Sequence, residues 1–149
     1  MKRSDALTPL SRDHQHALAV ALALRRADGA GAGAAIKRFR DFFESEGRAH
    51  FRIEEDLLLS ALPADDAEWS TAVARVREDH TAIRAAAAEL PATAADVRAL
   101  GRRLHDHVRL EEHVLFGILE RRLTEDELER LGRAVAEAER ALTPGHGAP

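Results

Sequence analysis

Apolar side chains recur every three or four residues along most of the chain, which is the spacing of one face of an α-helix. Ala, Leu, Arg and Glu dominate the composition, and glycine and proline fall between the apolar runs. These breakers predict helices over 8–28, 34–62, 70–90 and 95–123. A fifth helix is predicted to open at the capping box Thr124-Glu125-Asp126-Glu127 and to fade at Thr143-Pro144-Gly145 into a frayed tail.

Four long helices joined by short loops predict an all-α fold, an up-down-up-down four-helix bundle. We assign residues 1–123 to the bundle and residues 124–149 to an amphipathic helix and tail of the same domain. The fifth helix is expected to pack outside the bundle or against a partner, so a homodimer through it is one expectation. Its apolar residues are Leu128, Leu131, Val135 and Leu142.

Histidine interrupts the apolar seam of each bundle helix, and glutamate follows it four residues later in two of them. Residues 50–55, HFRIEE, align with residues 107–112, HVRLEE, and the first and third helices carry the similar pairs Asp13-His14 and Asp79-His80. Positions four apart share a helix face. The chain therefore reads as two similar helical hairpins with interior polar residues His14, His50, Glu54, His80, His107 and Glu111.

These six residues are predicted to lie at one level of the bundle. Counting about 1.5 Å of rise per residue from the predicted loops brings the four histidines within about one turn of each other. A single histidine on an apolar face is ordinarily a core residue with a hydrogen-bond partner. Two buried carboxylates at one level are different, because unpaired buried charge is very costly. Divalent cations would compensate that charge, so the pattern indicates a metal site.

The ligand types narrow the metal. Imidazole and carboxylate ligands suit iron, manganese, zinc, copper or nickel. Two carboxylates can each bridge two ions, which favours a dinuclear site, and four histidines with two bridging glutamates leave positions for a bridging oxygen species and outside ligands. Open positions are typical of a site built for binding or chemistry. Iron is the metal we expect, with manganese or zinc as alternatives.

Composition removes several classes of protein. The net charge of −4 shows no basic excess, so we expect no nucleic-acid partner. The absence of cysteine excludes thiolate zinc sites, iron–sulfur clusters and cysteine nucleophiles, and the absence of tyrosine excludes a phenolate ligand. No apolar run is long enough for a membrane helix, and no signal peptide is evident, so we expect a cytoplasmic protein without a membrane partner.

The order H…HxxxE…H…HxxxE within a four-helix bundle resembles the hemerythrin-like, or HHE cation-binding, family over about residues 8–123. The resemblance implies a non-haem di-iron centre with a bridging oxo or hydroxo species. By position, it implies His14, His50, Glu54, His80, His107 and Glu111 as ligands, with Glu54 and Glu111 bridging. Ferritin-like di-iron proteins match less well, because they use an ExxH pair and none occurs here.

The chain departs from the oxygen-carrying members at the third helix, where those proteins resemble it but carry HxxxH. The residues four before and four after His80 are Val76 and Arg84. A missing fifth histidine favours redox chemistry or sensing over simple reversible oxygen carriage. The remaining histidines of the bundle helices lie off the ligand faces and are expected at the surface or around the ligands: His16, His105 and His113.

Carboxylates beside the predicted ligands have two interpretations. Asp13, Asp79 and Asp106 each precede a histidine and could reach a ligand only from an adjacent helix, so we expect ordinary solvent exposure. Glu55 and Glu112 are expected at the surface, paired with arginines; a register error of one residue would put them in place of Glu54 and Glu111.

Four functions remain open. The first is a di-iron protein that binds or senses O2, peroxide or NO. The second is a redox enzyme on the same centre, either peroxidase- or catalase-like or NO-handling, and the catalytic residues are then unknown. The third is an iron-homeostasis module. The fourth is a metal-free helical interaction domain, which the repeated HxxxE pairs disfavour.

Overall fold

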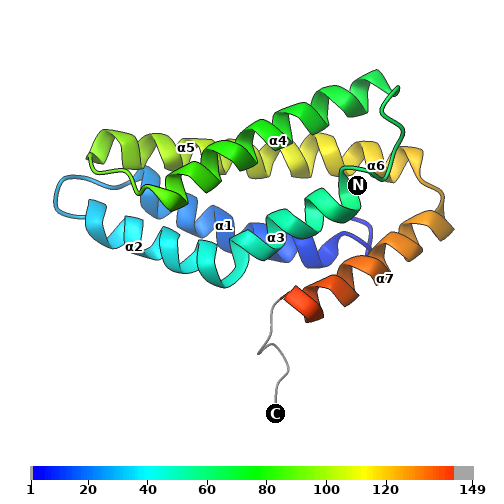
Figure 1. Cartoon of the computed structure of the whole chain (residues 1–149), viewed down its shortest axis with the longest axis horizontal. Coiled ribbons are helices and arrows are strands. Elements are labelled where there is room, and N and C mark those ends of the chain that lie inside the picture. The colour runs from blue at the N-terminus through cyan, green and yellow to red at the C-terminus, as the bar shows by residue number, and fades with distance from the viewer. Residues whose placement is uncertain (1, 143–149) are drawn as a thin grey trace, which may run out of the picture.

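The computed structural model describes residues 2–142, and their regular secondary structure is entirely helical (Figure 1). The predicted frayed tail, residues 143–149, lies outside the described residues. The segments are α1 (Thr8–Arg25), α2 (Ala32–Phe42), η1 (Phe43–Gly47), α3 (Arg48–Ile53), η2 (Glu54–Leu58), α4 (Ala67–Ala88), α5 (Ala94–Leu110), η3 (Glu111–Leu115), α6 (Phe116–Arg122) and α7 (Glu125–Leu142).

Each of the five predicted helices is present. The second runs without a loop from α2 to η2 and ends four residues before the predicted Leu62; the fourth runs from α5 to α6. The segments η1, η2 and η3 are π-helical turns, which the apolar spacing did not predict. Two of them begin at Glu54 and Glu111, and π-turns inside α-helices are frequent at functional sites.

Side-chain caps fix three of the helix starts. Asp66 accepts a hydrogen bond from the backbone N–H of Trp69, and Thr93 accepts one from Asp96, both at 3.1 Å. The predicted capping box is confirmed: the Glu127 N–H donates to Thr124 Oγ1 at 3.1 Å, and the Thr124 N–H donates to a Glu127 carboxylate oxygen at 2.8 Å. These bonds satisfy N–H groups that have no partner within their own helix.

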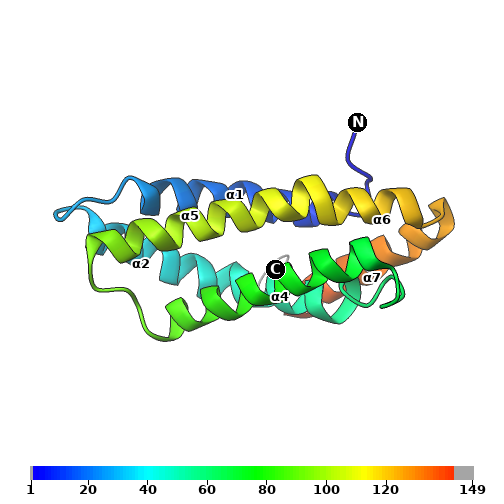
Figure 2. The same cartoon turned by 90° about the horizontal axis from the view of Figure 1, so that it is seen from above.

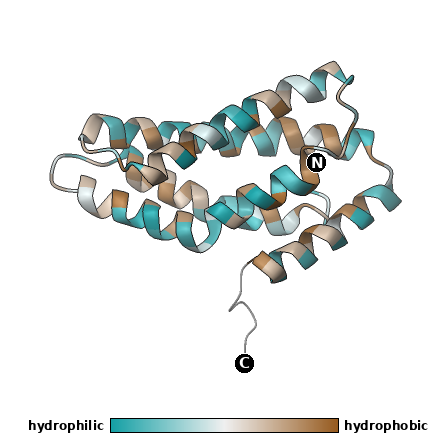
Figure 3. Cartoon of the chain, in the orientation of Figure 1, coloured by the Kyte–Doolittle hydropathy of each residue, from teal (hydrophilic) through white to brown (hydrophobic). Residues whose placement is uncertain are grey.

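The four long helical segments lie side by side and bury two apolar clusters (Figures 1 and 2). Each helix contributes to both apolar clusters, and its predicted interior polar residues lie where it passes from one cluster to the other. On α1, Leu10 belongs to the first of these clusters and Ala17 to the second. On α4 the same change falls between Val76 and Ile83. Figure 3 shows hydrophilic positions alternating with hydrophobic ones along each ribbon. The polar residues therefore form a layer between two apolar regions.

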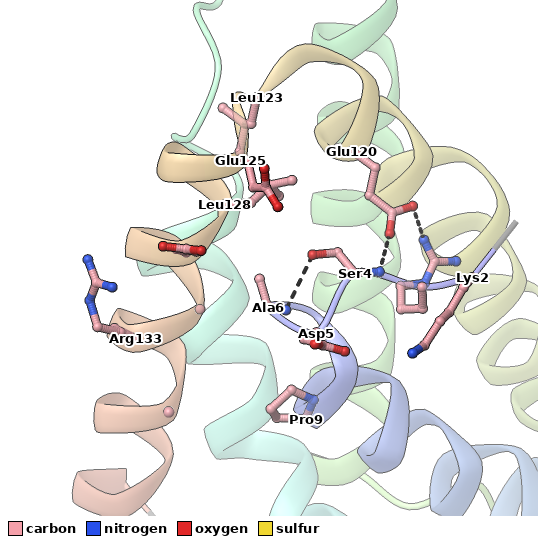
Figure 4. Close-up of a pocket in the computed structure, with 14 residues that line it drawn as sticks. Lys2, Ser4, Asp5, Ala6, Pro9, Glu120, Leu123, Glu125, Leu128 and Arg133 are labelled. Carbon is pink, nitrogen blue, oxygen red and sulfur yellow. Dashed lines mark hydrogen bonds and ion pairs between the residues drawn. The ribbon is translucent and has the colours of Figure 1, made fainter.

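Helix α7 folds back along the outside and packs against α3 and η2 (Figure 1). Val135 is fully buried, and at Gly132 an added Cβ would lie 2.9 Å from Ala6. The N-terminal segment is held by Glu120, which accepts hydrogen bonds from Arg3 and from the Ser4 N–H (Figure 4). None of the helices within residues 2–142 combines the length and the apolar character that a membrane-spanning helix needs.

Candidate metal centre

The six predicted interior polar residues are buried together in the bundle. None is more than 6 % exposed, and Glu54, His80 and Glu111 are fully buried. α1 provides His14, α3 provides His50 and α4 provides His80, and the rest of the set comes from η2, α5 and η3. The predicted convergence of the four helices at one level is therefore present in the structure.

The six residues form two groups of four that share both glutamates. One group joins His14 and His50 to the two glutamates, and the other joins His80 and His107 to the same glutamates, Glu54 and Glu111. Within each group, one ligand atom from every residue lies within 4.8 Å of the others. Shared carboxylates between two pairs of imidazoles are the arrangement that bridging ligands of two ions require.

The interior contacts are made by the Nε2 atoms of the histidines. The Nε2 atoms of His14 and His50 lie 3.1 Å apart, and His80 Nε2 lies 3.2 Å from Glu54 Oε2. His50 and His107 each contact the glutamate four residues later on the same helix, at Oε1 of Glu54 and of Glu111. Every imidazole thus presents Nε2 to the two carboxylates.

The opposite nitrogen of each of these imidazoles, Nδ1, faces a carboxylate. The Nδ1–O distances are 2.9 Å from His14 to Glu112, 3.0 Å from His50 to Asp13, 2.7 Å from His80 to Glu55 and 3.2 Å from His107 to Asp79. A proton on Nδ1, donated to the carboxylate, leaves Nε2 with its lone pair free for a cation, and such partners orient metal-binding imidazoles.

Two of our expectations for these carboxylates were wrong. Asp13 and Asp79 are not simply exposed: each reaches the histidine of an adjacent helix. Glu55 does pair with Arg84, as expected, but it also holds His80, and Glu112 accepts hydrogen bonds from Ser11. Asp106 does remain at the surface, against His105.

Sequence spacing missed these contacts because they join different helices. A residue beside a ligand points away from the ligand's face of its own helix. When helices pack closely, a side chain that points this way reaches the neighbouring helix and can contact a ligand there. The signal that was available was the repetition of the charged neighbour in both halves: Asp before a single histidine, and Glu after each HxxxE pair.

The buried imidazoles and carboxylates strongly change one another's pKa values. Burial would lower the pKa of His80, but the neighbouring Glu111 and Glu54 outweigh it and raise that pKa to about 9. Burial would likewise lower the pKa of His107, but the charge of Glu111 and the hydrogen bond to Asp79 raise it to about 10. Burial would raise the pKa of Glu54, but His50 and the other imidazoles hold it well below its usual range. Without metal, protons on imidazoles therefore balance the carboxylates.

Several buried polar atoms of the group have no hydrogen-bond partner even when the imidazoles are protonated. Whether those atoms suit a cation tests the metal-binding interpretation. Within the described part of the chain, both carboxylate oxygens of Glu54 and of Glu111 have no hydrogen bond of normal geometry, nor does Nε2 of His80 or His107. Buried polar atoms without partners are rare and costly in native proteins. All six are N and O donors suited to a divalent cation, so the residues fit a metal-binding role.

The place of the missing fifth histidine holds no substitute ligand. Val76 is fully buried in an apolar cluster, and Arg84 forms two hydrogen bonds to Glu55, at 2.6 and 2.8 Å. The side chains of His16 and His105, 45 % and 33 % exposed, face Glu46 and Asp106, and His113 is exposed, so none of these three joins the buried groups.

Fold and site together define a helical bundle with buried His/Glu groups suited to binding metal. The family model of the hemerythrin HHE cation-binding domain matches residues 5–119, and the chain belongs to this family. The resemblance seen in the sequence is thereby confirmed. Comparison with curated proteins and with solved structures gave no significant match.

Proposed function

We propose that the chain holds two iron ions through His14, His50, Glu54, His80, His107 and Glu111, and that this centre binds or senses O2, peroxide or NO. The observation that carries the proposal is the pair of four-residue groups that share Glu54 and Glu111. Each group alone would suit one cation, and the shared carboxylates suit two neighbouring ones. A bridging oxo or hydroxo species would complete such a centre, and manganese or zinc is the alternative metal.

A small apolar pocket beside the group supports a small ligand. His14, His50 and His107 line it together with apolar side chains such as Phe51 and Val108. Its volume of about 10 Å³ is close to the smallest space that can hold a water molecule. A diatomic molecule or peroxide matches this size better than an organic substrate does.

The finer architecture belongs to the same proposal. We assign residues 1–123 to an up-down-up-down bundle and residues 124–149 to an extension of the same domain, which the family match over residues 5–119 supports. A homodimer through α7 stays a prediction. So does a cytoplasmic location.

Metal content per chain, measured with the visible spectrum in air and after reduction, tests the proposal. We expect about two irons per chain and an absorption that changes on reduction. The His107→Ala variant should lose metal, and His105→Ala, which alters a partly exposed histidine on the same helix, should keep it. A folded protein without metal would contradict the proposal and favour an interaction domain.

The same preparation separates the remaining functions. Binding or sensing predicts a spectral change that saturates on titration with peroxide or NO. A redox enzyme would consume either molecule over many turnovers. An iron-homeostasis module would release its iron readily and change fold with loading.

A further inference from the structure

The carboxylates behind the four histidines are supported unequally in the two groups. In the group of His80 and His107, arginines hold both: Arg84 donates twice to Glu55, and Arg103 donates to Asp79 at 3.0 Å. Bidentate and charge-assisted bonds of this kind fix a carboxylate's position. The ring it holds is then fixed as well.

The group of His14 and His50 lacks such a pair of arginines. Ser11 donates to Glu112, and Arg3 reaches the same carboxylate only at 3.9 Å. Within residues 2–142, no arginine or lysine forms an ion pair with Asp13, which lines the same pocket as Glu139 of α7. The carboxylate that holds His50 therefore faces a pocket that α7 lines, and no arginine fixes its position.

The same group lies nearest to solvent. His50 is 6 % exposed, the most of the six residues. It lines a pocket of about 430 Å³ between α1, α3 and α7, which we call the α7 vestibule and which is lined by Asp13, Glu46, Ala49, Ala136 and Glu139, among others. On the opposite side, a pocket of about 520 Å³ reaches Asp79 and Arg103 but neither His80 nor His107.

We infer that metal ions enter and leave through the α7 vestibule, so that the ion held by His14 and His50 exchanges first while Arg84 and Arg103 retain the ion held by His80 and His107. The inference rests on the proposed function, since it assumes two bound ions. It concerns the rate of exchange rather than the affinity. A cation beside the site repels a metal ion, but release requires a ligand ring to swing away, and the arginines oppose that motion.

Cobalt(II) serves as the probe, because it is paramagnetic and each imidazole bound to it gives a hyperfine-shifted N–H proton resonance. The full-length protein is loaded with cobalt and challenged with an excess of chelator. We expect two phases of release. The resonances of His14 and His50, assigned with single histidine variants, should disappear in the first phase and those of His80 and His107 in the second.

Two matched pairs of variants test the route and the arginines separately. Ala136→Leu narrows the vestibule and should slow the first phase, while Ala134→Leu, on the same helix but outside that lining, should not. Arg103→Gln should speed the second phase about ten-fold, while Arg102→Gln at its exposed neighbour should not.

The outcomes are distinct. Two ions released in one phase, or early loss of the His80 and His107 resonances, would overturn the inference and leave the proposed function standing. An unchanged first phase in Ala136→Leu, with a folded protein by circular dichroism, would exclude the vestibule as the route. Failure to bind cobalt or iron at all would overturn the proposed function and this inference with it.

Discussion

At the scale of single residues, the two nitrogens of each buried imidazole have different roles. Nδ1 is held by a carboxylate from a neighbouring helix, and Nε2 faces the shared glutamates. The carboxylate fixes the ring orientation and keeps a proton on Nδ1, so that Nε2 is the nitrogen that would lose its proton to a cation. Removing a shared glutamate and removing a supporting carboxylate should consequently have different effects.

Glu54→Ala and Glu111→Ala should each remove at least one metal ion per chain, because each glutamate belongs to both ligand groups. Metal analysis of purified protein measures the loss. Glu44→Ala, at an exposed residue of the same long helix, is the control and should keep both ions. Full metal content in both interior variants would refute the bridging assignment.

The metal-free protein should become less stable as pH rises from neutral toward 10. His80 and His107 have pKa values of about 9 and about 10 in the fold, above the ordinary value of 6.5. A raised folded-state pKa contributes stability that is fully present below the unfolded pKa and is lost as pH rises through the folded pKa. Urea unfolding of the metal-free protein between pH 6 and pH 10 checks this, and a flat or rising free energy of unfolding would contradict it.

At the scale of helices, apolar spacing and the glycine and proline breakers predicted four helices, and the capping-box motif predicted the start of the fifth. The three- and four-residue spacing also matches the buried side of α1, where Leu10, His14, Ala17, Ala21 and Leu24 are all buried. The π-turns at Glu54 and Glu111 were missed, because a single extra residue in a turn leaves no mark in a three- and four-residue pattern. The carboxylate contacts were missed for a different reason: they depend on which helices become neighbours.

Gly101 allows α1 and α5 to pack closely. A Cβ at this position would lie 2.7 Å from the backbone nitrogen of Arg25 and 2.8 Å from Cβ of Leu24. Because backbone cannot move aside, Gly101→Ala should destabilise the protein by about 1–3 kcal/mol. Gly117→Ala, with no atom within 4 Å of the added Cβ, should instead stabilise it by about 0.5–1 kcal/mol. Urea unfolding of both variants measures the contrast.

Helix α7 should be dispensable for holding metal but not for the rate of its exchange. A chain that ends at Leu123 keeps the six buried polar residues and loses Glu139 and the vestibule wall. We expect unchanged metal content and faster chelation. A truncated protein that stays soluble but loses metal would show that α7 is part of the binding unit.

At the scale of the whole molecule, one large pocket lies apart from the six buried polar residues. The pocket of about 810 Å³ in Figure 4 lies between the N-terminal segment and α7, and none of the six buried polar residues lines it. Its lining mixes Lys2 and Arg133 with Asp5, Glu120 and Glu125. The six buried residues are instead almost completely shielded from solvent, so the packing of the surrounding helices controls access to them.

The proposed metal centre would draw its ligands from both of the repeated halves of the chain. The first half contributes His14, His50 and Glu54, and each group also draws one glutamate from the opposite half. Two of the four supporting contacts cross the same boundary, because Glu112 holds His14 and Glu55 holds His80.

A split protein should therefore reassemble in a metal-dependent way. Fragments 1–62 and 63–149, produced separately, each lack a complete ligand group. A divalent ion would therefore bind to and stabilise only their heterodimer. Sedimentation of the mixed fragments with and without cobalt(II) measures this complementation. Equal association in both conditions would mean that the apolar clusters alone hold the two fragments together, and that the ion adds nothing to the stability of the assembled bundle.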